Sequence, residues 1–169
     1  LGGGITIGSL TLIGGEPGIG KSTLLMEVCG QILSHSHREK ILYVSGEESE
    51  HQVASRSKRL RISTDQLLIY HETCWQRILD QIKELKPKFL VIDSIQTTYS
   101  QQIESAAGTQ SQIREVTYEL MNFCKANHLT CFIIGHVTKE GHIAGPKILE
   151  HMVDTVIYFE GDQLGQYRI

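Results

Sequence analysis

The chain has 169 residues and 40% of them are hydrophobic, which fits one domain with a buried core. Its net charge of -3 excludes a domain that attracts nucleic acid over its whole surface, so any DNA contact must come from local patches. The sequence has neither an apolar run of the ~18 residues that span a bilayer nor a signal-peptide pattern, so we expect a cytoplasmic protein with no membrane partner.

Strands and helices are predicted to alternate along the chain. Strands are predicted at residues 9–13, where Gly14 and Gly15 end the run, and at 41–44, 67–70, 89–92, 131–134 and 153–160, with a seventh starting at 166–169. Helices are predicted after Lys21 and at about 49–60, 75–85 and 110–127. This alternation predicts an α/β fold with a mostly parallel β-sheet flanked by helices on both faces, in which ligands bind beyond the carboxyl ends of the strands.

The cysteines do not form a C-x-x-C pair, so no zinc ribbon is expected within this sequence. We interpret them as reduced, mostly buried thiols. They are Cys29, Cys74, Cys124 and Cys131.

A phosphate-binding pattern follows the first predicted strand. Residues 15–22 read G-E-P-G-I-G-K-S and satisfy the P-loop pattern G-x-x-x-x-G-K-[ST] between a strand and a helix. Glycines let successive backbone N–H groups point at phosphate oxygens, Lys21 supplies a charge for the β and γ phosphates, and Ser22 offers a hydroxyl to Mg²⁺. We therefore expect ATP and Mg²⁺ to bind here. The expected ATP-binding residues are Gly15, Glu16, Pro17, Gly18, Ile19, Gly20, Lys21, Ser22 and Thr23.

Three later strand ends carry polar residues. Asp93 ends an apolar strand in the Walker B pattern and is expected, with Ser22, to orient Mg²⁺. Glu47 and Glu48 follow the second strand, where a carboxylate can polarise the attacking water, although both also suit a solvated helix N-terminus. His136, at the end of the fifth strand, suits a sensor of the γ-phosphate or a histidine satisfied by its neighbours.

Six stretches of the chain match one family of proteins: residues 1–4, 8–15, 43–49, 91–97, 135–141 and 144–154. In these stretches the chain resembles the bacterial RadA (Sms) family of DNA-repair ATPases. The last two stretches distinguish this family, because RecA, replicative helicases of the DnaB kind and KaiC-like ATPases share the P-loop and fold but lack that pair.

The resemblance implies a RecA-like P-loop NTPase fold and a hexameric, ATP-driven motor. This motor acts on single-stranded DNA during recombinational repair, promotes branch migration, binds ATP between neighbouring subunits and has a recombinase as its expected partner. The resemblance also makes Glu47 the catalytic base beside Lys21, and it makes Gln96 and His136 elements that couple the γ-phosphate to the rest of the domain.

Two DNA-facing loops are expected from position, at about residues 97–112 and 137–149. The second contains Lys139, His142 and Lys147 among glycines, which suits contact with backbone phosphates. The first is rich in Gln, Ser and Thr, and Arg114 lies just beyond it. Both loops also fit ordinary surface.

A basic cluster at residues 56–61 fits either a solvated helix face or a contact between subunits. The chain departs from the family pattern at Glu16, where Asp is common, and at residues 107–109, where Ala-Gly-Thr replaces Pro-Gly-Ser. We expect residues 1–169 to be a single RecA-like ATPase domain excised from a longer protein. Its zinc module, its K-N-R-F-G motif and its C-terminal domain like the Lon protease are absent from this sequence.

Two other functions remain open from the sequence. One is a KaiC-like switch that binds ATP to assemble and rarely hydrolyses it, which the Glu47–Glu48 pair also suits. The other is a replicative-type helicase, which the two discriminating stretches disfavour.

Overall fold

The computed structural model describes residues 4–36, 38–62, 65–136 and 149–161. In this part of the chain six strands form one sheet in the order β3-β2-β4-β5-β1-β6, and all five neighbouring pairs are parallel. The predicted parallel sheet is therefore confirmed. The strands are β1 (Leu10–Gly15), β2 (Ile41–Ser45), β3 (Leu67–His71), β4 (Phe89–Asp93), β5 (Thr130–His136) and β6 (Thr155–Phe159).

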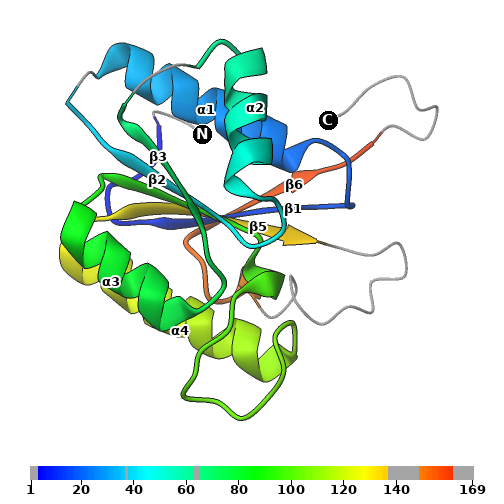
Figure 1. Cartoon of the computed structure of the whole chain (residues 1–169). Coiled ribbons are helices and arrows are strands. Elements are labelled where there is room, and N and C mark those ends of the chain that lie inside the picture. Colours follow the sequence, from blue (N-terminus) through cyan, green and yellow to red (C-terminus); the bar gives the residue numbers. More distant parts are fainter. Residues whose placement is uncertain (1–3, 37, 63–64, 137–148, 162–169) are drawn as a thin grey trace.

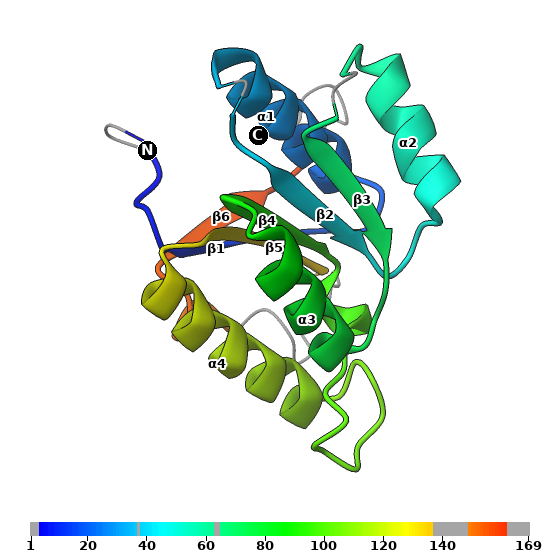
Figure 2. The same cartoon turned by 60° about the vertical axis from the view of Figure 1, so that its left-hand side comes forward.

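Helices cover both faces of the sheet, as predicted. Figures 1 and 2 show α1 (Lys21–His35) and α2 (Glu50–Arg59) on one face, and α3 (Trp75–Leu85) and α4 (Gln110–Asn127) on the other. Each face has its own buried cluster, one built with α1 and α2 and the other with α3 and α4. None of the described helices has the length and hydropathy of a segment that crosses a bilayer.

Strand β2 shows why the central strands are apolar at nearly every position. Ile41 and Tyr43 pack into the cluster under α1 and α2, whereas Leu42 and Val44 pack into the cluster under α3 and α4. Because successive side chains of a strand point to opposite faces, a strand covered on both faces must be apolar on both.

The order of the strands reverses within the sheet, and this creates the site described below. The connections after β1 and β2 lead toward the β3 edge, whereas those after β3 and β4 lead back through the centre. Connections that diverge in this way leave a crevice at the carboxyl ends of the strands. The ends of β1, β2, β4 and β5, which carry the sequence motifs, therefore meet at one edge.

The first strand is longer than predicted. Gly14 and Gly15 do not end β1 but belong to it, because they pair with β5 on one side and with β6 on the other. A Cβ atom at Gly14 would lie 2.8 Å from the ring of Tyr158, so the glycine permits a close approach of β6 rather than a turn. The seventh predicted strand, at residues 166–169, lies outside the described residues.

The core under α3 yields a test of the fold. Ile78 is fully buried between α3 and the sheet, so Ile78→Ala should lower the free energy of unfolding by ~2–5 kcal/mol. Urea denaturation followed by circular dichroism measures this change. The control is Lys83→Ala on the exposed side of the same helix, which should change stability by less than ~0.5 kcal/mol. Equal stability of the two variants would contradict the described packing.

Candidate functional site

A cavity of about 610 Å³ opens at the carboxyl ends of β1, β2, β4 and β5. One part of its lining comes from the loop after β1 and the start of α1: Pro17, Gly18, Gly20, Lys21, Ser22 and Thr23. The rest comes from segments far away in sequence: Glu47, Glu48, Arg56, Asp93, Gln96 and His136. Of the other sequence-predicted residues, Gly15 is the last residue of β1, and Glu16 and Ile19 belong to the loop, but none of the three lines the cavity.

A larger cavity, of about 820 Å³, lies between α1 and residues 60–62. Its lining is mainly aliphatic, and Glu27 and Arg61 are its charged side chains. The smaller cavity is the functional candidate because the polar and charged side chains converge there.

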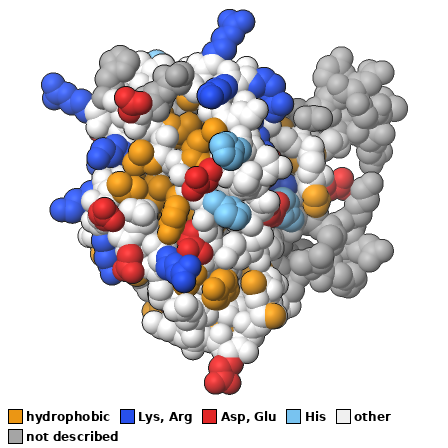
Figure 3. All heavy atoms as spheres, viewed as in Figure 1, with side chains coloured by type: hydrophobic (Ala, Val, Ile, Leu, Met, Phe, Trp, Pro, Cys, Tyr) orange, Lys and Arg blue, Asp and Glu red, His pale blue; other side chains and the backbone are white. Residues whose placement is uncertain are grey.

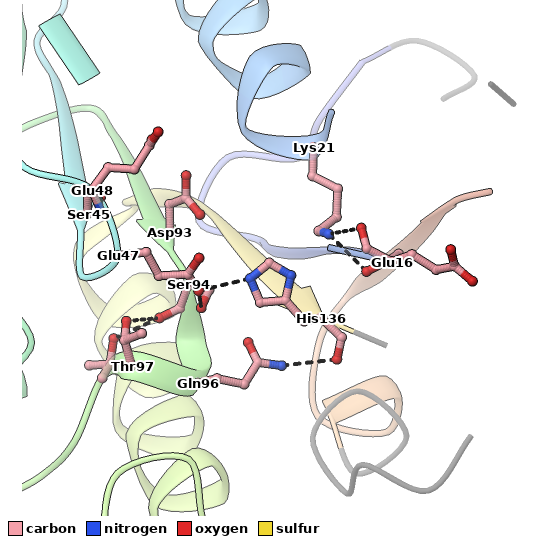
Figure 4. Close-up of polar contacts among 12 residues, drawn as sticks. Glu16, Lys21, Ser45, Glu47, Glu48, Asp93, Ser94, Gln96, Thr97 and His136 are labelled. Atoms are coloured by element: carbon pink, nitrogen blue, oxygen red, sulfur yellow. Dashed lines mark hydrogen bonds and ion pairs between the residues drawn. The ribbon is translucent and has the colours of Figure 1, made fainter. Parts of the chain in front are cut away.

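The loop after β1 has the backbone geometry of a phosphate cradle. Gly18 and Gly20 adopt φ angles of 78° and 111°, which side chains with a Cβ atom rarely adopt. Lys21 then starts α1, and its Nζ donates to the carbonyl oxygens of Gly15 and Glu16, both at 2.8 Å (Figure 4). The lysine is only 3% exposed, so its ammonium group is already directed into the loop.

Burial lowers the pKa of Lys21, and the nearby charges of Asp93 and Glu47 oppose this shift. The two carboxylates therefore help to keep the ammonium group charged inside a partly desolvated site. A charged, buried lysine is suited to bind phosphate oxygens, whose own charges would replace the carbonyl dipoles.

Asp93 is fixed by a neighbouring strand. Its Oδ2 accepts a hydrogen bond from the hydroxyl of Tyr43 on β2 at 2.6 Å, and Asp93 itself is 3% exposed. Burial and the charge of Asp93 raise the pKa of Tyr43 well above its ordinary value, so the phenol remains a donor. Sequence reasoning missed Tyr43, although a tyrosine in the run Ile-Leu-Tyr-Val was a visible signal.

Glu47, Gln96 and His136 come together in one network. Ser94 follows Asp93 through a cis peptide bond, and its hydroxyl donates to Glu47 Oε1 at 2.5 Å. The same oxygen lies 2.9 Å from Nε2 of His136. Gln96, in the short helix η1 (Ile95–Thr97), donates from Nε2 to the backbone oxygen of His136 at 3.3 Å. Figure 4 shows these side chains pointing toward one another beside Asp93.

The surroundings of Glu47 favour its ionised form. Burial alone would raise the pKa of this carboxyl group, but hydrogen bonds from Ser94 and His136, with the charges of His136 and Lys21, outweigh burial and lower the pKa. Glu47 therefore carries a negative charge at neutral pH and can accept a proton.

Glu48 has different partners, although it adjoins Glu47. Its carboxylate forms an ion pair with Arg56 of α2, and its backbone N–H donates to the hydroxyl of Ser45 at 3.0 Å. Helix α2 begins just beyond, where Ser49 and Gln52 form a capping box. Both glutamates thus precede the first turn of α2, and both carboxylates have partners in the cavity, although the Glu47 side chain remains exposed.

The cavity contains most of the unsatisfied buried polar atoms of the described part of the chain. The buried side-chain atoms without a hydrogen-bond partner are Arg56 Nη1, Gln96 Oε1, Glu119 Oε1 and His136 Nδ1. Three of these four belong to residues that line the cavity. Each such atom costs about 1–3 kcal/mol, so the site is suited to a polar ligand. ATP and Mg²⁺ fit, since Lys21 can bind phosphate and the Ser22 hydroxyl and Asp93 carboxylate are oxygen ligands suited to Mg²⁺.

One of the predicted DNA-binding residues, Arg114, is exposed on α4 and does not line this cavity. The other three, Lys139, His142 and Lys147, lie outside the described residues. The first predicted loop is shorter than expected, because α4 begins at Gln110. Its main chain is ordered by the buried side chain of Gln112, which binds backbone atoms of Ser100, Ile103 and Ser105. Sequence reasoning missed this role.

Comparison with known proteins agrees with the fold. A family model described as an AAA domain matches residues 1–142. In the solved structures, a KaiC-like protein from the archaeon Pyrococcus horikoshii OT3 superposes with a TM-score of 0.73 over 99% of this chain and 78% of that chain. Their sequences are 20% identical, so this likeness bears on the fold.

Curated relatives are much more similar in sequence. The protein named DNA repair protein RadA from Aquifex aeolicus (strain VF5) is 52% identical over all 169 residues, which cover 37% of its own length. The protein of the same name from Streptococcus pyogenes serotype M1 is 54% identical over the same span, again 37% of its length. The chain thus spans little more than a third of these relatives. It belongs to the RadA family, of which it is the RecA-like ATPase domain with an α/β P-loop NTPase fold.

Proposed function

We propose that the protein is an ATP-driven DNA repair and recombination motor that acts on single-stranded DNA and promotes branch migration. The observation that carries this proposal is the network of Glu47, Gln96 and His136. It joins the nucleotide cavity to the main chain that enters residues 137–149, the expected DNA-facing loop. The relatives' name, DNA repair protein RadA, supports the same function.

ATP hydrolysis follows from the positions of the side chains in the cavity. Lys21 exchanges its two carbonyl partners for oxygens of the β and γ phosphates. Glu47 accepts a proton from the water that attacks the γ phosphorus, and the bond between that phosphorus and the β–γ bridging oxygen breaks to give ADP and phosphate. Ser22 and Asp93 would hold Mg²⁺, which would supply positive charge against the phosphates. Tyr43 keeps the Asp93 carboxylate in place.

The coupling of ATP hydrolysis to DNA depends on His136, which contacts Glu47. His136 Nε2 lies against the same carboxylate oxygen that receives the Ser94 hydroxyl, so a change in the charge or position of Glu47 alters both contacts. Gln96 donates a hydrogen bond to the backbone oxygen of His136, which is the last residue of β5 before the second loop. The presence of the γ phosphate is thereby transmitted to the loop.

DNA contact is assigned to Arg114, Lys139, His142 and Lys147, which bind backbone phosphates without reading bases. Figure 3 shows basic and acidic side chains interspersed on one face rather than gathered in one basic patch, in keeping with binding by loops.

Residues 1–169 act as one ATPase domain of a longer cytoplasmic protein. That protein works as a hexameric ring with ATP between subunits and cooperates with a recombinase.

The first test removes the phosphate-binding lysine from the full-length protein. Steady-state ATP hydrolysis is measured with and without single-stranded DNA. We expect DNA to stimulate the wild type, and Lys21→Ala to lower hydrolysis by ~10²–10³-fold because the phosphates lose their buried cation. Lys83→Ala, which removes an exposed lysine, should keep the wild-type rates. A hydrolysis rate that is the same with and without DNA would instead support an ATP-dependent assembly switch.

A second test concerns the proposed base. Glu47→Gln retains the shape of the side chain but cannot accept the proton, so the hydrolysis rate should fall by ~10²–10⁴-fold while ATP still binds. Rapid-quench single-turnover assays and fluorescent-nucleotide titrations separate these effects. The matched control is Glu84→Gln on the exposed face of α3. A Glu47→Gln variant that hydrolyses ATP at the normal rate would exclude Glu47 as the base.

A third test addresses the second loop. Lys147→Ala should weaken binding of single-stranded DNA and reduce the slope of log affinity against log salt concentration by about 0.7, since one phosphate contact is lost. Fluorescence anisotropy at several salt concentrations measures this slope, with Lys83→Ala as the control. An unchanged slope would show that Lys147 does not contact a DNA phosphate.

A further inference from the structure

Arg56 differs from the other members of the basic cluster at residues 56–61. Its side chain is 12% exposed and lines the nucleotide cavity, whereas Lys58, Arg59 and Arg61 are exposed to solvent. The four basic side chains therefore do not form one solvated helix face, because Arg56 is largely buried. An arginine is rarely buried without a partner that uses its charge, so the position of Arg56 needs an explanation.

The partners of Arg56 in the described structure do not use its whole guanidinium group. Nη2 forms the ion pair with Glu48, while Nη1 is buried and has no hydrogen-bond partner. Burial and Asp93 raise the pKa of Tyr43, and the charge of Arg56 opposes that rise, so the guanidinium lies within electrostatic reach of the Tyr43–Asp93 pair. One ion pair with a half-buried glutamate leaves part of the donor capacity of Arg56 unmet.

The arrangement of charges in the cavity suits a polyphosphate. Lys21 and Arg56 are the lysine and arginine of its lining, and they come from the start of α1 and from α2, respectively. Figure 4 shows Lys21 and Glu48, the ion-pair partner of Arg56, on opposite sides of Asp93 in that view. Two cations that line one cavity with the Walker B carboxylate can both bind phosphate oxygens. A guanidinium suits a terminal phosphate because it donates a pair of parallel hydrogen bonds.

We propose that Arg56 binds the terminal phosphate of ATP from within the same subunit, and that Glu48 positions Arg56. The two adjacent glutamates then have separate tasks, since Glu47 faces the attacking water and Glu48 orients a cation. Arg56 thereby distinguishes a nucleoside triphosphate from a diphosphate. This inference rests on the ATPase assignment and is independent of action on DNA.

The test compares affinities for ATPγS and ADP, each with Mg²⁺, in the full-length protein. Arg56→Ala should lower the ratio of ATPγS affinity to ADP affinity by about 10- to 100-fold, because a charge-assisted contact to the terminal phosphate is lost. Arg59→Ala, which removes an exposed arginine from the same helix, should leave the ratio unchanged. Glu48→Gln should give an intermediate decrease, since it loosens Arg56 without removing it.

Thermal unfolding of the nucleotide-free variants separates a binding role from a structural one. If Arg56→Ala does not fold, Arg56→Gln retains a polar side chain of similar reach and is measured in its place. A ratio that stays at the wild-type value in the folded variant would show that Arg56 only anchors Glu48, and would overturn the proposal. If DNA does not change the ATP hydrolysis rate of the wild type, the motor function is contradicted. The ratio of ATPγS affinity to ADP affinity still tests the role of Arg56 in that case.

Discussion

The parallel pairing of β1, β2, β4 and β5 is the constraint on which the site depends. Every neighbouring pair is parallel, so all these strands end at the same edge of the sheet. Residues as distant as Lys21 and His136 thus line one cavity. The contact of Glu47 with both Ser94 and His136 joins the ends of three strands through a single carboxylate oxygen. A shift in the register of β5 by one residue would turn His136 to the other face and break this contact.

The strands, the helices and the P-loop and Walker B residues of the cavity were predictable because each has a local signal. Helical spacing marked α4 at its observed bounds, and the P-loop pattern and the final carboxylate of β4 located Lys21 and Asp93. The strand ends were less predictable. Gly14 and Gly15 resemble a turn in sequence, and only the partners on both sides show that they belong to a strand.

The remaining features depend on contacts between distant segments and have little local signal. The sequence offers no means of separating Arg56 from its basic neighbours, since the difference lies in burial beside Glu48. Tyr43 stands out in the sequence as a polar side chain in an apolar strand, but its role appears only when β4 pairs with β2 and Asp93 accepts a hydrogen bond from its hydroxyl. Glu47 and Glu48 are adjacent and chemically identical, and their different partners arise from where the chain turns into α2.

The buried side chain of Gln112 has a consequence for the first surface loop. Its amide binds the main chain at Ser100, Ile103 and Ser105, so the loop is fastened to the first turn of α4. A segment that is already ordered loses little conformational entropy when it meets a ligand. Any partner that contacts this loop therefore encounters a preformed surface.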